Sequence, residues 1–139
     1  MSTQYYCVGF AFSEDRTHVL LLRKNRPAWQ AGKLNGVGGK VEEGEPPLDA
    51  MVREFREETG ILTVPAMWRD VGAYRGPGFW IGVFATETDL VWSARAVTDE
   101  VPILLPLAEL AAANGIPNLQ WLIPLCLDRT TKKLLIEEV

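Results

Sequence analysis

One acidic segment constrains what this chain can fold into more than any other feature. Residues 39–45 read GKVEEGE and, after seven further residues, residues 53–61 read REFREETGI. On a helix that turns by about 100° per residue, Glu54, Glu57 and Glu58 fall within one arc of about 100°. Like charges at this spacing cost a helix a few tenths of a kcal/mol per pair, so the cluster predicts a compensating divalent cation.

The two ends of this helix carry their own signals. Pro46 and Pro47 suit a first helical turn, where a proline sacrifices no intrahelical hydrogen bond, and Gly60 suits a left-handed C-terminal cap. We therefore predict a helix over residues 46–59. Small Ala50 falls beside the acids, where we expect it to leave room for a ligand. The expected core-facing stripe, separate from the acids, consists of Leu48, Val52, Phe55 and Thr59.

Strands and helices alternate along the rest of the chain. Period-two apolar patterns and turn residues predict strands over residues 4–12, 18–24, 66–74, 79–86, 101–105 and 133–139. Further helices are predicted at residues 107–113 and 119–128, the second capped by Asn118. Because helices are interspersed among strands, we expect one α/β domain over residues 1–139, an α/β/α sandwich on a mixed sheet.

Residues 39–61 resemble the Nudix box, which reads Gly, five residues, Glu, seven residues, and then Arg-Glu-apolar-any-Glu-Glu-any-Gly-apolar. Every fixed position matches, although Phe55 is bulkier than the usual aliphatic residue. A solvated surface helix, the usual explanation of a charge run, does not account for such a match. Nudix proteins hydrolyse a nucleoside diphosphate linked to another group, using Mg²⁺ or Mn²⁺. The resemblance thus implies a Nudix-type fold and this metal-dependent chemistry.

The resemblance also implies roles for the residues of the box. The metal ligands that it implies are Glu54, Glu57, Glu58 and the backbone carbonyl of Gly39. Arg53 would orient the glutamates through Glu45, and Arg53, Glu54 and Glu57 are the catalytic residues that it implies within the box. Carboxylate oxygens suit magnesium or manganese, and the sequence contains no cysteine and histidine cluster that would favour zinc.

One acid outside the box is a further catalytic candidate. Many Nudix proteins place an extra acid in a loop opposite the box helix, where it binds metal or takes a proton from water. Glu100 has a comparable place in this sequence. The competing interpretations are that Asp99 has this role, or that Glu100 is an ordinary loop charge.

Residues upstream of the box are candidates for substrate binding. Residues 32–45 are similar to the corresponding run in MutT-like enzymes that act on nucleoside triphosphates, where an asparagine reads the purine. Asn35 holds that position, and a turn-forming role before Gly36 is the alternative. Lys40, Arg23 and Lys24 would meet phosphates or, alternatively, would only be solvated.

A later stretch has a weaker resemblance to the base-contacting segment of oxidised-purine enzymes. Those enzymes carry paired aspartates where this chain has Asn118 and Leu119. The resemblance thus makes Asn118 a candidate base contact but does not extend to a preference for 8-oxoguanine. Trp29 and Trp121 offer indole surfaces on which a base could stack, with simple packing as the alternative.

Composition limits the other classes of function. A net charge of −4 without a basic stripe argues against binding of a nucleic acid polymer. Cys7 and Cys126 stand alone in apolar runs, which indicates buried thiols in a reducing compartment, although a disulfide is the alternative. The sequence shows no signal peptide and no membrane span, so we expect a cytoplasmic protein without a membrane partner, and the pattern is compatible with a homodimer.

Two classes of function follow from these observations. The first is metal-dependent hydrolysis of a nucleotide, foremost a nucleoside triphosphate or a modified one, to a monophosphate and pyrophosphate. Hydrolysis of ADP-ribose, a nucleotide sugar or a dinucleoside polyphosphate is the alternative within this class. The second class is a Nudix regulator that binds a nucleotide without hydrolysing it. Because all the glutamates of the box are present, we expect the enzyme.

Overall fold

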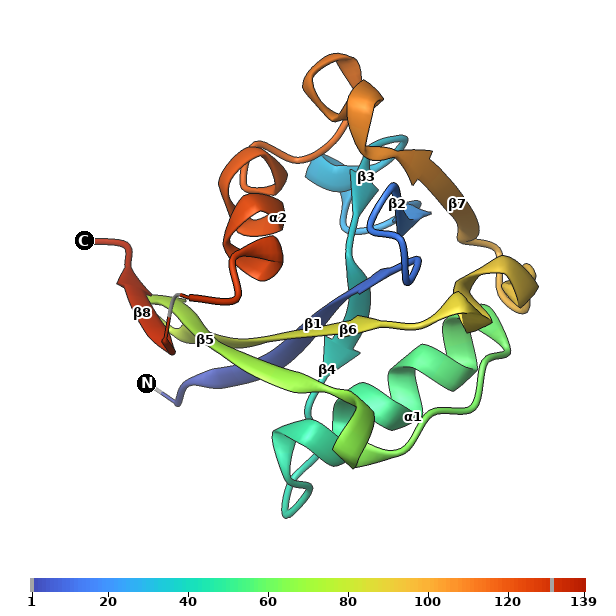
Figure 1. Cartoon of the computed structure of the whole chain (residues 1–139). Coiled ribbons are helices and arrows are strands. Elements are labelled where there is room, and N and C mark those ends of the chain that lie inside the picture. The colour runs from blue at the N-terminus through green and yellow to red at the C-terminus, as the bar shows by residue number, and fades with distance from the viewer. Residues whose placement is uncertain (1, 131) are drawn as a thin grey trace.

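The computed structural model describes residues 2–130 and 132–139. Its strands are β1 (Gln4–Phe12), β2 (His18–Arg23), β3 (Leu34–Asn35), β4 (Val37–Lys40), β5 (Arg69–Gly76), β6 (Phe79–Glu87), β7 (Val101–Pro106) and β8 (Leu134–Glu137). Its α-helices are α1 (Pro47–Thr59) and α2 (Leu119–Leu127), and short 3-10 helices are η1 (Ala28–Gln30), η2 (Pro65–Met67), η3 (Asp89–Ser93) and η4 (Leu107–Ala112). Figure 1 shows this arrangement.

The strands form one mixed sheet in the order β3-β2-β1-β6-β5-β8, with β4 also paired to β1 and β7 to β2. β1 runs parallel to β6, and β5 runs parallel to β8, whereas the other pairs are antiparallel. Helices α1 and α2 lie on opposite sides of this sheet (Figure 1). The expected α/β/α sandwich on a mixed sheet is therefore confirmed.

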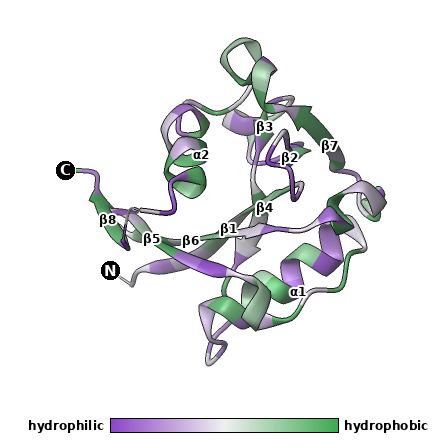
Figure 2. Cartoon of the chain, viewed as in Figure 1, coloured by the Kyte–Doolittle hydropathy of each residue, from purple (hydrophilic) through white to green (hydrophobic). Residues whose placement is uncertain are grey.

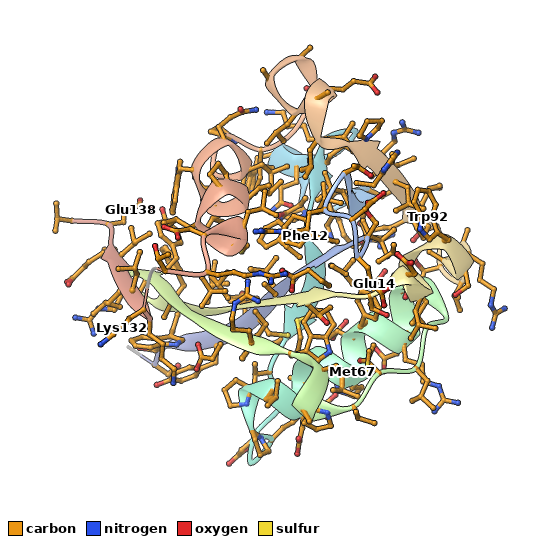
Figure 3. All side chains as sticks on the ribbon, viewed as in Figure 1. Phe12, Glu14, Met67, Trp92, Lys132 and Glu138 are labelled. Carbon is orange, nitrogen blue, oxygen red and sulfur yellow. The ribbon has the colours of Figure 1, made fainter. Side chains whose placement is uncertain are left out.

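The core is divided between the two faces of the sheet. Alternate residues of β1 point in opposite directions, so Phe10 and Phe12 join the cluster under α2, whereas Cys7 and Ala11 join the cluster under α1. Figure 3 shows Phe12 inside the molecule, where it is fully buried. Because both faces are covered, β1 is apolar almost throughout instead of alternating between apolar and polar residues.

The two cysteines also lie on opposite faces. Cys7 belongs to the cluster under α1 and Cys126 to the cluster under α2, and both are buried and free. Burial raises the pKa of the Cys7 thiol to about 11 and that of Cys126 to about 12. The interpretation as separate buried thiols is confirmed, and a disulfide between them is excluded.

Helix α1 ends where its sequence predicts. Gly60 adopts a left-handed conformation with φ 75°, and its N–H donates to the carbonyl of Arg56 at 2.9 Å. The prediction that the acidic face of α1 is separate from the core was wrong. Around the helix axis, Glu54 and Glu58 lie between Ala50 and Met51, and both of these residues are fully buried. Ala50 therefore packs in the core and leaves no room for a ligand. Figure 2 shows hydrophobic (green) and hydrophilic (purple) segments alternating along α1.

Three other local predictions need correction. The glycine-rich segment before α1 forms strands β3, paired with β2, and β4, paired with β1. Gly38 allows the second pairing, because a Cβ atom there would meet the carbonyl of Cys7. Strand β5 begins at Arg69, since residues 65–67 form η2. Asn118 makes no side-chain cap at the start of α2, because its own backbone is already helical, with φ −63° and ψ −22°. No helix among the described residues is long and apolar enough to cross a membrane.

Candidate active site

The acids of α1 pack against the glycine-rich strand β4. A Cβ atom added to Gly39 would lie 2.6 Å from the carboxyl carbon of Glu54, a distance too short for any side chain. The Glu54 side chain is only 12% exposed, whereas Glu57 is 55% exposed. Glycine at position 39 therefore leaves the space in which the Glu54 carboxylate lies between the helix and the sheet, and a side chain there would push that carboxylate aside.

Arg53 holds this group of acids together. It donates to both carboxylate oxygens of Glu45 at 2.9 Å, from Nε and Nη2. Its Nη1 donates to Glu54 at 3.0 Å and to Glu57 at 3.3 Å, and Nη2 also donates to the carbonyl of Lys40 at 3.0 Å. The guanidinium thus joins α1 to β4 and to the loop between them, which gives the carboxylates a defined geometry.

The charges of the inner acids are incompletely balanced. Burial raises the pKa of Glu54, and the nearby Arg53 offsets only part of this effect. Burial likewise raises the pKa of Glu58, although the Lys24 ammonium and a hydrogen bond from Thr98 oppose the shift. Both carboxylates would therefore be stabilised by additional positive charge.

The donor chemistry of this face fits a hard divalent cation. Carboxylate oxygens of Glu54, Glu57 and Glu58 and the Gly39 carbonyl are the oxygen donors that Mg²⁺ and Mn²⁺ prefer. Within residues 2–130 and 132–139, no group of three or more acidic, histidine or cysteine side chains already converges on one point. Glu54 and Glu57 instead turn towards Arg53, and Glu58 turns towards Thr98. Their role as ligands stays a prediction.

Glu100 lies beside these acids but in a different environment. It is 3% exposed and accepts hydrogen bonds from the Lys24 ammonium at 2.7 Å and from the N–H of Asn25 at 2.7 Å. Burial would raise the pKa of Glu100, but the Lys24 and Asn25 hydrogen bonds outweigh it and lower that pKa below its ordinary value. Asp99, the competing candidate, forms an exposed ion pair with Arg26 at 2.6 Å.

A cavity of about 460 Å³ adjoins the acidic face. Tyr6, Val8 and Ile81 contribute apolar lining, and Gly39 and Lys40 lie at the side shared with α1. Lys24, Gln30 and Asn35 supply polar atoms to the lining. The cavity thus combines an apolar surface, a few polar groups and a border with the acids, as small-molecule sites commonly do.

The predicted substrate-binding residues are divided by the structure. Lys24, Asn35 and Lys40 line the cavity, whereas four other predicted residues are not among its lining: Arg23, Trp29, Asn118 and Trp121. Trp29 is 60% exposed. Trp121 packs on the core under α2, with its ring 5.7 Å from that of Tyr74.

Lys24, which was predicted with Arg23 as a phosphate contact, lies in the candidate site, and so does Gln30, which was not predicted. Lys24 follows Arg23, which pairs with Val101 across β2 and β7, so Lys24 meets the preceding residue, Glu100. Lys24 and Glu100 carry opposite charges at the ends of two apolar strands, β2 and β7. Their ion pair could have been predicted from the sequence only if the pairing of these strands had been known. Gln30 had no signal of its own in the sequence.

Sequence comparison identifies relatives of this chain. A family model for the NUDIX domain matches residues 5–124. A segment of 46 residues is 48% identical to the uncharacterized Nudix hydrolase YvcI of Bacillus subtilis strain 168, covering 33% of this chain and 27% of that protein. Another match, of 54 residues, is 43% identical to the 8-oxo-dGTP diphosphatase of Escherichia coli K12 and covers 39% of this chain and 41% of that protein. Both matches span less than half of the relatives' own lengths.

Solved structures share the fold. MutT from a study of Aliivibrio salmonicida and Vibrio cholerae has a TM-score of 0.72 and 21% identity, covering 90% of this chain and 98% of that one. The NUDIX domain of Shewanella oneidensis NrtR, solved with ADP ribose, has a TM-score of 0.77 and 16% identity, covering 94% and 90% of the two chains. The structural likeness, the complete box on α1 and the family match over residues 5–124 together show that this chain belongs to the Nudix hydrolase family.

Proposed function

We propose that this chain is a metal-dependent pyrophosphohydrolase that converts a nucleoside triphosphate to a monophosphate and pyrophosphate. One observation carries this proposal: the acidic face and the cavity share strand β4. Gly39 lies against the Glu54 carboxylate and also lines the cavity, next to Lys40. A nucleoside bound in the cavity would therefore extend its phosphates towards the acids of α1.

Each part of this site has a chemical role in the proposal. Exposed Lys40 at the cavity wall would contact a phosphate oxygen, and Arg53 would keep Glu54 and Glu57 in position. Glu54, Glu57, Glu58 and the Gly39 carbonyl would hold the metal. A bound Mg²⁺ or Mn²⁺ would neutralise phosphoryl oxygens and lower the pKa of an attacking water. A carboxylate of α1, or Glu100, would accept the proton of that water.

The relatives support a triphosphate but also leave a second candidate. One relative is named for 8-oxo-dGTP, a nucleoside triphosphate, whereas one structural neighbour was solved with ADP ribose. ADP-ribose also contains a nucleoside diphosphate and would place its pyrophosphate along the same strand. Its hydrolysis, or its binding without hydrolysis as in a regulator, is therefore the second candidate function.

A substrate screen tests these candidates together. Purified protein is incubated with Mg²⁺ and with nucleoside triphosphates, 8-oxo-dGTP, ADP-ribose, a nucleotide sugar or a dinucleoside polyphosphate, and the products are separated by chromatography. We expect the fastest turnover for a nucleoside triphosphate, release of pyrophosphate, and loss of activity after chelation of the metal. Turnover of ADP-ribose alone would favour the second candidate. Binding without hydrolysis of any substrate would favour the regulator.

A further inference from the structure

Gln30 and Asn35 form a pair of hydrogen-bonded amides in the wall of the cavity. Asn35 lies in β3, and Gln30 is the last residue of η1. The N–H of Gly36 donates to Oδ1 of Asn35 at 2.7 Å, and Nδ2 of Asn35 donates to Oε1 of Gln30 at 3.0 Å. A backbone N–H can only donate, so it determines the orientation of the first amide, which in turn determines that of the second.

This arrangement leaves the amide nitrogen of Gln30 as the group without a partner inside the pair. The carbonyl oxygens of both side chains already accept hydrogen bonds. The amide nitrogen of Gln30 makes no hydrogen bond within the described part of the chain, and Gln30 lines the cavity. An amide nitrogen carries two N–H donors and no acceptor. The amide pair therefore presents a hydrogen-bond donor to the cavity.

We propose that Gln30 selects the nucleobase, and that it favours bases with a carbonyl group over bases with an amino group at the contacted position. This inference rests on the proposed function, because it concerns the same cavity. A base carbonyl accepts a hydrogen bond from Gln30, whereas a base amino group would face another donor and leave both unpaired. Asn35 is then a positioning residue, which orients Gln30.

Two pairs of nucleotides isolate this contact. Inosine and adenosine triphosphates differ at the six position of one ring system, with a carbonyl in the first and an amino group in the second. Uridine and cytidine triphosphates differ in the same way at the four position. We expect the wild type to favour the carbonyl member in kcat/KM by about fivefold or more in at least one pair, the scale of one hydrogen bond.

Gln30→Glu should reverse this preference. A carboxylate still accepts from Nδ2 of Asn35, but its second oxygen presents an acceptor to the base, which suits an amino group. The added negative charge acts on all triphosphates alike, so it cancels in the ratio of the two members. Gln30→Leu, which removes both donor and acceptor, should bring the ratio to about one, and Asn35→Ala should reduce it in the same direction.

Gln120→Glu is the matched control, because Gln120 is exposed, contacts the carbonyl of Leu110 and does not line the cavity. It should keep the wild-type ratio. The inference would be overturned by a wild type without preference in either pair. It would also be overturned if Gln30→Glu and Gln30→Leu both kept the wild-type ratio.

A binding measurement separates this inference from the proposed function. Calorimetric titration with the monophosphates of inosine, adenosine, uridine and cytidine reports base preference without any turnover. If the wild type hydrolyses no triphosphate but Gln30→Glu reverses the preference in binding, the proposed activity is wrong and the inference stands. If triphosphates are hydrolysed and binding shows no dependence on residue 30, the inference is wrong and the activity stands.

Discussion

Two acids of α1, Glu54 and Glu58, and the acid of the neighbouring loop, Glu100, are withdrawn from solvent, but their charges are balanced differently. Glu100 has a lysine ammonium and a backbone N–H as close partners, and its pKa is lowered. Glu54 and Glu58 have partners too, yet burial dominates and their pKa values are raised. Thr98 connects the two regions, because its hydroxyl contacts both Glu58 and the Glu100 backbone.

This difference separates two uses of a buried carboxylate. A carboxylate whose partners outweigh its desolvation holds neighbouring segments together, as Glu100 does for residues 24–26. A carboxylate whose desolvation is not balanced lowers stability unless a cation joins it. We therefore expect substitutions in α1 to affect activity most, and substitution of Glu100 to affect stability most.

The largest expected effect is on turnover. Glu54→Gln removes the charge of the carboxylate that lies against Gly39 while it keeps the side-chain shape. We expect kcat/KM for the preferred substrate to fall by about two orders of magnitude or more, the scale for loss of one major electrostatic contribution at a site. Steady-state kinetics with saturating Mg²⁺ would measure it.

Glu137→Gln is the control for this experiment, because Glu137 on β8 forms an exposed ion pair with Arg75 on β5 and does not line the cavity. Its kinetics should match the wild type. If Glu54→Gln retained wild-type kinetics with a normal melting temperature, the acids of α1 would not form the reactive face. The expectation that the acids of α1 serve activity and Glu100 serves stability would then be wrong.

Features that depend on local pattern were predictable from the sequence. The helix at 46–59, its left-handed cap at Gly60 and the mixed α/β architecture all follow from neighbouring residues, and the structure differs by one residue at the start of α1. Strands β3 and β4 were missed because a glycine-rich run carries no apolar alternation. They become strands only through their pairing with β1 and β2.

The site was predictable where the chemistry is contained in one segment. Arg53, Glu54 and Glu57 lie within the box, and the structure places them with Glu45 in one hydrogen-bonded group. The burial of Glu54 could not be predicted, because it depends on the absence of a side chain at Gly39 across the helix–sheet contact. The Lys24–Glu100 pair and the Gln30–Asn35 pair likewise depend on which segments the fold brings together.

Glu100→Gln should have the largest effect on stability. It leaves the Lys24 ammonium, whose side chain is 15% exposed, without its charged partner. We expect the free energy of unfolding to fall by about 3 kcal/mol, the scale for removing one member of a buried ion pair. Urea unfolding would measure it, and Asp99→Asn, at an exposed ion pair, should change stability much less.

Kinetics of the same variant decide the role of Glu100. A fall in kcat by about tenfold or more at a temperature where Glu100→Gln is fully folded would show proton transfer or metal binding by Glu100. An unchanged kcat with lowered stability would show that Glu100 only holds the loops together.

The lowered pKa of Glu100 also predicts a smaller, pH-dependent effect. The pKa in the folded protein lies below the ordinary value of 4.5, so the stabilisation is complete above about that pH and is lost as the pH falls through the folded pKa. The stability difference between wild type and Glu100→Gln should therefore shrink as the pH is lowered below about 4.5. Urea unfolding of both proteins from pH 7 to pH 3 would measure this, and a constant difference would contradict the assignment to Glu100.

The smallest expected effect has the opposite sign and lies in α1. Without a divalent metal, Glu58→Gln removes a half-buried charge next to Glu54 and Glu100, at the cost of its attraction to Lys24. Because burial dominates at Glu58, we expect the free energy of unfolding to rise by a few tenths of a kcal/mol, the scale of relieving one like-charge pair on a helix. With Mg²⁺, the wild type should gain stability and the variant should gain less, since anything that binds the folded state stabilises it. Thermal melting with and without Mg²⁺ measures both differences. If the metal-free Glu58→Gln variant were less stable than the wild type, the charge partners of Glu58 would outweigh its burial, as those of Glu100 do. The contrast between the two regions would then be wrong.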